Sequence, residues 1–69
     1  MFAKFQEYSH MTVMLDMFKL VRRGAVLTQG QCKKLFYAHD MLITHGYTDY
    51  ATIMMQRIEK SASQIIKDL

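Results

Sequence analysis

The chain has 69 residues, 51% hydrophobic and 22% charged, and its formal net charge at pH 7 is +3. This composition excludes disorder driven by low hydrophobicity and high charge, but so short a chain usually needs a disulfide set, a metal or another subunit for stability. The single cysteine, Cys32, excludes an internal disulfide framework, and three scattered histidines make a poor structural metal site. Oligomerisation or a bound partner is therefore expected.

The start of the chain lacks the features of an export signal. Residues 1–7 contain no basic segment followed by a long apolar stretch and a small-residue cleavage site. The most apolar run, residues 11–21, is interrupted by Asp16 and Lys19 and is shorter than the roughly 20 apolar residues that cross a bilayer. We expect a cytoplasmic protein without a membrane partner, and the lone thiol fits a reducing compartment.

The first helix is expected to span residues 3–23 and to be closed by Gly24. The chain has no proline, so its breaks are found from glycines and capping residues. Thr28 and Gln31 have the spacing of a capping box, in which the threonine oxygen accepts from a backbone N–H and the glutamine reaches back. A second helix is therefore predicted over residues 29–45.

The end of the second helix is marked by Gly46, in a position where helices commonly end in a left-handed residue. Thr48 then supplies a cap, and Asp49 a negative charge at the positive end of a new helix dipole. The third helix is predicted over residues 49–68. The fold class is all-α, with residues 1–69 in one domain: a three-helix bundle or a helical hairpin plus a long first helix, assembled as a homodimer.

Periodicity supports the second and third helices, because each carries one apolar face at helical spacing. No strand-like alternation of useful length occurs. The stripe predicted for the second helix consists of Cys32, Leu35, Phe36, His39, Leu42 and Ile43. The stripe predicted for the third helix consists of Ala51, Met54, Met55, Ile58, Ala62, Ile65, Ile66 and Leu69.

The first helix is apolar on two sides, and this is its most informative feature. Steps of about 100° per residue place Met11, Met14, Leu15, Phe18 and Val21 on one face, with a second apolar face beside it. We expect two helices of so short a chain to leave part of this surface uncovered. The alternatives are a homodimer interface, which is favoured, the core of the chain itself, and a site for another protein. The predicted partner or dimer interface consists of Val13, Met14, Met17 and Leu20.

A basic patch is predicted at the junction of the first two helices, with Asp16 as the only acid near it. It would bind nucleic-acid phosphates, or it is a solvated face in which arginines suit the end of a helix dipole. The second helix, the turn and the third helix resemble a DNA-reading helix-turn-helix poorly, because Asp49 at the start of the third helix would face DNA phosphates. The patch consists of Lys19, Arg22, Arg23, Lys33 and Lys34.

Catalytic and metal-binding patterns are missing from the sequence. His10, His39 and His45 form no HxxxH pair, Cys32 forms no CxxC pair, and no nucleophile stands beside a base. A glycine-rich phosphate loop is absent too. We therefore predict no enzyme activity, no catalytic residues, no cofactor and no metal.

The predicted function is that of a small regulatory protein that binds another protein, as an adaptor, an inhibitor or an assembly factor. Bacteriophages and mobile elements often encode accessory proteins of this size. A phage or mobile-element origin is expected on that frequency alone, and no residue of the sequence indicates it. The alternative is a small nucleic-acid-binding regulator that uses the basic patch. Salt distinguishes the two, because phosphate binding weakens steeply with salt and an apolar contact does not.

Overall fold

The computed structural model describes residues 2–68, with the side chains of residues 8–65 and of Lys67. This part of the chain forms three helices and no strand: α1 (Phe2–Arg22), α2 (Gln29–Thr44) and α3 (Thr48–Asp68). Each helix begins and ends within one residue of its predicted bounds. The all-α prediction is therefore confirmed.

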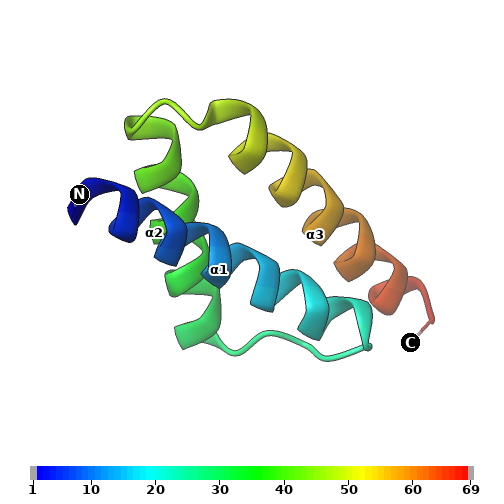
Figure 1. Cartoon of the computed structure of the whole chain (residues 1–69). Coiled ribbons are helices and arrows are strands. Elements are labelled where there is room, and N and C mark those ends of the chain that lie inside the picture. Colours follow the sequence, from blue (N-terminus) through cyan, green and yellow to red (C-terminus); the bar gives the residue numbers. More distant parts are fainter. Residues whose placement is uncertain (1, 69) are drawn as a thin grey trace.

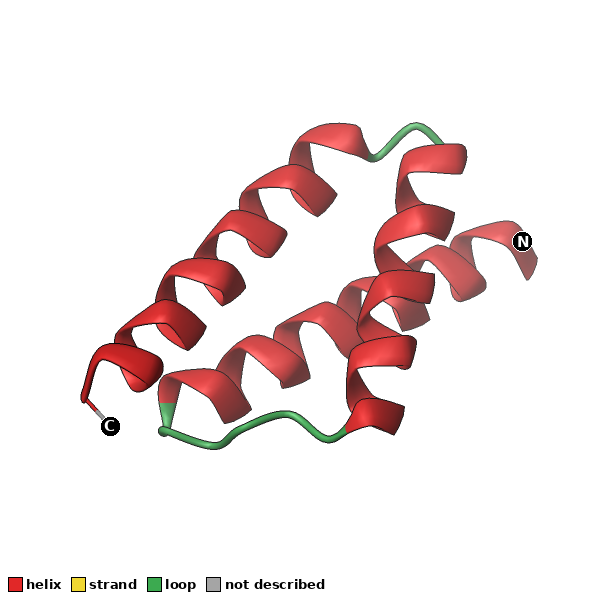
Figure 2. Ribbon diagram, turned by 180° about the vertical axis from the view of Figure 1, so that it is seen from behind, coloured by secondary structure: helices red, strands yellow, loops and turns green. Residues whose placement is uncertain are grey.

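The three helices do not lie in one parallel array. α1 and α3 run in the same general direction, and α2 crosses α1 at a steep angle on its way back (Figure 1). α2 and α3 meet at the short turn between them and separate away from it, as both views show (Figures 1 and 2). The start of α2 and the end of α3 consequently lie apart, with the loop after α1 between them.

The start of α2 is fixed by the predicted capping box. The backbone N–H of Gln31 donates to Oγ1 of Thr28 over 3.1 Å, and the N–H of Thr28 donates to Oε1 of Gln31 over 2.8 Å. Two amide groups that the first helical turn would leave unpaired are satisfied in this way. The sequence prediction for this helix start is confirmed.

The ends of α1 and α2 are built alike. At each end the glycine N–H donates to the carbonyl three residues back, and the next N–H donates to the carbonyl five residues back. This is a Schellman motif, which requires a left-handed residue, and Gly24 and Gly46 supply it with φ of 94° and 92°. Both glycine predictions are confirmed.

The start of α3 differs by one residue from the prediction. Thr48 lies inside the helix, and the carbonyl of Tyr47 accepts from the N–H of Ala51 over 3.1 Å, so Tyr47 takes the capping position. The prediction of Thr48 as the cap is wrong, because the first hydrogen bond of the helix begins one residue earlier. Asp49 lies in the first turn as expected.

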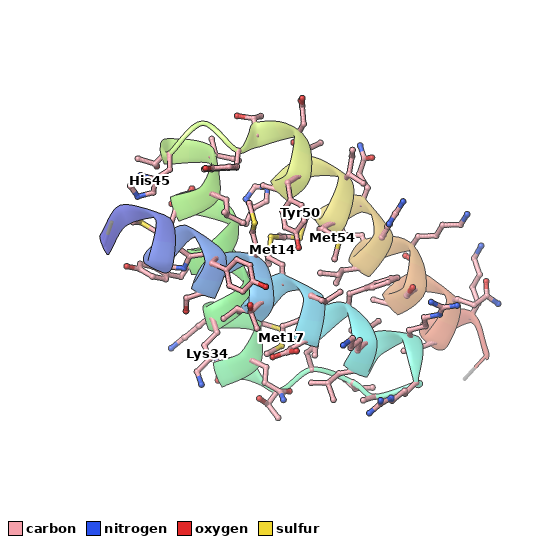
Figure 3. All side chains as sticks on the ribbon, in the orientation of Figure 1. Met14, Met17, Lys34, His45, Tyr50 and Met54 are labelled. Atoms are coloured by element: carbon pink, nitrogen blue, oxygen red, sulfur yellow. The ribbon has the colours of Figure 1, made fainter. Side chains whose placement is uncertain are left out.

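The core draws on all three helices, and Met14 and Leu42 are fully buried within it. Figure 3 shows Met14, Met54 and Tyr50 close together between α1 and α3. The Tyr50 hydroxyl donates to the Met11 carbonyl of α1 over 3.2 Å and ties the start of α3 to the first half of α1. The buried residues are Met14, Met17, Val21, Leu35, Ala38, Leu42, Ala51, Met54 and Ile58.

The core face of α1 is turned relative to the predicted stripe. Leu15, predicted in the core, is 40% exposed, whereas Met17, predicted on the second face, is only 8% exposed. At about 100° per residue, Met14, Met17 and Val21 fall within about 60° of one another, and Leu15 falls outside this arc. The reason is tertiary: α1 packs against α2 and α3 together, so its core face is centred between the two predicted faces.

The stripe predicted for α2 is partly wrong for the same reason. Phe36 is 61% exposed and Ile43 is 38% exposed, while Ala38, which was not predicted, is buried. The buried face follows Leu35, Ala38 and Leu42. Ala38 has a small side chain, which lets a neighbouring helix approach closely.

The stripe predicted for α3 agrees with the structure over its described residues. Ala51, Met54 and Ile58 are buried, and Met55, Ala62 and Ile65 are partly buried against the core. The side chains of Ile66 and Leu69 lie outside the described residues.

Candidate binding pocket

The four residues of the predicted interface pack inside the chain. Met14 and Met17 are buried, and Val13 and Leu20 are partly buried against the core. Among the described apolar side chains of α1, only Tyr8 and Leu15 are exposed. Met14 and Met17 thus belong to the core of the chain, which was one of the alternatives, while Val13, Leu20 and Leu15 keep part of their surface exposed. The homodimer stays a prediction.

The five residues of the predicted basic patch are exposed but fall into two groups. Lys19, Arg22 and Arg23 lie at the end of α1, and Lys33 and Lys34 lie in the first half of α2. The loop between them is drawn out across the molecule (Figure 1), and Lys34 projects outward from α2 (Figure 3). The two groups thus flank the loop and do not form one compact cluster.

The histidines lie in different surroundings. The His10 ring meets the Tyr37 ring edge to face, with 5.6 Å between centroids, while His39 is half-buried and His45 stands at the C-cap of α2. No group of three or more His, Cys, Asp or Glu within the described part of the chain is placed to hold a metal ion. None of the described helical segments is long and apolar enough to cross a membrane.

An apolar pocket of about 350 Å³ lies between the three helices and the loop after α1. Its lining comes from Val21 at the end of α1, loop residues 25–27, the first half of α2 and the middle and second half of α3. Figure 2 shows these segments around the wide end of the wedge between α2 and α3. Ala25 and Ala62 line this end and are too small to fill it. Divergence of two helices and small side chains at their wide end therefore create the pocket.

The pocket has a fixed floor and an exposed rim. Val21, Leu35 and Ile58 belong both to its lining and to the core, so the core holds them in place. Val26 of the loop is 75% exposed and Phe36 of α2 is 61% exposed, and both also line the pocket. Its volume lies within the range of about 300–1,000 Å³ that is usual for binding pockets. A partner whose apolar side chains fill the pocket would contact both the floor and the rim, and would remove the apolar surface of both from water.

Sequence reasoning missed this pocket, although one signal for it was present. Residues 25–27, Ala-Val-Leu, are a continuous apolar segment in a loop, where polar turn residues are usual. The free thiol of Cys32, predicted on the buried stripe, is half-buried and lines the same pocket. The comparisons with known proteins found no matching family model, curated protein or solved structure.

Proposed function

We propose that this chain is a small non-enzymatic protein that binds another protein through the pocket, as an adaptor, an inhibitor or an assembly factor. The observation that supports this proposal is the open apolar pocket with Val26 and Phe36 exposed at its rim. Exposed apolar side chains around a concave apolar site are typical of interaction sites and costly to leave in water. The free thiol of Cys32 supports a cytoplasmic setting for this activity.

The homodimer is a weaker proposal than a different partner. Its predicted interface would need Met14 and Met17 to leave the core of the chain. A two-fold dimer can instead be built with one pocket facing the other, and its test is the mass in solution. A nucleic-acid partner also has less support, because the basic residues stand in two groups on either side of the loop.

The test compares the pocket rim with an exposed apolar residue elsewhere. Phe36→Glu places a charge on the rim, and Ile53→Glu makes a similar change at a residue that is 48% exposed and does not line the pocket. Tagged wild-type chain and both variants are used to retain proteins from nuclease-treated lysate, with high-salt washing and mass spectrometry. We expect one protein in stoichiometric amount on the wild type and Ile53→Glu, and its loss from Phe36→Glu.

The same experiment separates the other candidates. Retention that survives Phe36→Glu would refute the pocket as the binding site. Recovery of nucleic acid alone, once nuclease and salt are omitted, would favour the basic residues. A dimer mass for the wild type and a monomer mass for Phe36→Glu, measured by light scattering, would show that a second copy covers the pocket.

A further inference from the structure

The floor of the pocket is part of the folded core. Val21, Leu35 and Ile58 line the pocket and are only 3%, 4% and 3% exposed. The remaining walls come from the loop after α1, from α2 and from α3, so the pocket is enclosed by segments of different directions. A small molecule that enters it meets apolar walls that folding has already ordered, and binding does not have to offset the cost of ordering them.

The size of the pocket limits what it encloses. A closed apolar cavity of about 150 Å³ takes up benzene, which has six carbon atoms. In proportion, a volume of about 350 Å³ corresponds to about 14 carbon atoms. Two fused aromatic rings or an aliphatic chain of about ten carbons fit within this limit.

The lining offers apolar contacts and almost no polar recognition. Of the twelve described residues that line the pocket, ten have hydrocarbon or thioether side chains, and the other two are Cys32 and the exposed Glu59. No buried side-chain nitrogen or oxygen in the described part of the chain lacks a hydrogen-bond partner, so the pocket floor holds no polar group that a ligand must satisfy. A polar group of the ligand would lose water there without replacement, which is costly. The enclosed part of the ligand is therefore apolar.

The charge at the pocket disfavours an acidic ligand. Carboxylates and phosphates are held in proteins by lysine, arginine or a similar charged donor. The described lining residues include no lysine or arginine, and Glu59 has the same sign of charge as an acidic head group. Fatty acids and phosphorylated lipids would thus gain nothing from their head groups, and the chemistry of the pocket favours a neutral molecule.

We propose that the pocket binds a neutral apolar small molecule of about 10–14 carbon atoms, such as a fused-ring aromatic compound or a long-chain alcohol. This site does not rest on the proposed function, because a small molecule needs no protein partner. Where a protein partner also uses the pocket, the molecule covers the same floor, competes with the partner and regulates its binding.

The experiment titrates the chain with N-phenyl-1-naphthylamine, a neutral dye whose emission rises in apolar surroundings, and displaces it with 1-decanol or with decanoate. These two competitors differ mainly in the charge of the head group. We expect saturable binding of one dye per chain and displacement by 1-decanol. Decanoate should displace the dye about three- to fivefold less effectively, because its carboxylate meets Glu59 and no cation.

A filled pocket tests the location of the site. Ala62 lines the pocket and is partly buried, so Ala62→Phe should occupy the space and weaken dye binding about tenfold or more. Gln56→Phe adds the same ring at an exposed position outside the pocket and should leave dye binding unchanged. Circular dichroism checks that both variants fold.

Cys32 gives a readout that needs no variant. Its thiol lines the pocket and is the only one in the chain, so saturating 1-decanol should slow its alkylation by iodoacetamide severalfold in the wild type. Unchanged alkylation, dye binding that survives Ala62→Phe, or decanoate as effective as 1-decanol would overturn the proposal. Dye binding that falls as the chain concentration rises, together with a dimer mass, would show that a second copy fills the pocket instead. None of these results depends on retention of a protein from lysate, so failure of this site and failure of the proposed function are distinguishable.

Discussion

The replacement of Met14 by alanine measures how α1 faces the core. Met14 is 0% exposed, and truncation of a buried methionine to alanine costs about 2–5 kcal/mol because it removes apolar contacts and leaves a cavity. A chain of this length is stabilised by about 3–10 kcal/mol in total, at about 0.05–0.15 kcal/mol per residue. Met14→Ala should therefore remove a large part of the free energy of unfolding.

Leu15→Ala is the matched control on the same helix. The predicted stripe places both residues in the core, whereas Leu15 is 40% exposed in the structure. Full burial of a leucine is worth about 1.5–3 kcal/mol, so a partly exposed one that leaves no closed cavity should cost about 1 kcal/mol. Both values follow from urea unfolding monitored by circular dichroism. Equal losses for the two variants would refute the orientation of α1.

Three further predictions concern the helix ends and the hydrogen bond between α3 and α1. Thr28→Ala should cost about 1 kcal/mol, because it removes the acceptor for the N–H of Gln31, and Thr28→Ser should restore most of that loss in urea unfolding. Gly46→Ala should cost about 1 kcal/mol or more, because its φ of 92° is unfavourable for a residue with a Cβ; a neutral effect on the thermal midpoint would contradict the left-handed turn. Tyr50→Phe should cost about 0.5–1.5 kcal/mol by loss of the bond to the Met11 carbonyl. Burial raises the pKa of Tyr50 above its ordinary value of 10.0, so its neutral form contributes stability below that pH and this contribution is lost above the raised pKa. Between about pH 9 and about pH 11, the free energy of unfolding should fall by more in the wild type than in Tyr50→Phe.

The helix ends were predictable from the sequence because they depend on local interactions. The capping box of Thr28 and Gln31 closes over four residues, and Gly24 and Gly46 end their helices through backbone conformations that other residues rarely adopt. None of these features needs a contact with a distant part of the chain. The bounds of all three helices consequently fell within one residue of the prediction.

The buried faces and the pocket were decided only by the tertiary structure. Periodicity shows that Met14, Leu15 and Met17 are apolar, but the directions from which α2 and α3 approach decide that Met17 is buried and Leu15 is not. The pocket depends on the divergence of α2 from α3, which no local pattern specifies. Its charged lining residue, Glu59, looks like any other residue of a solvated helix face in the sequence. Packing of segments that are far apart in the chain gives it its position beside an apolar pocket.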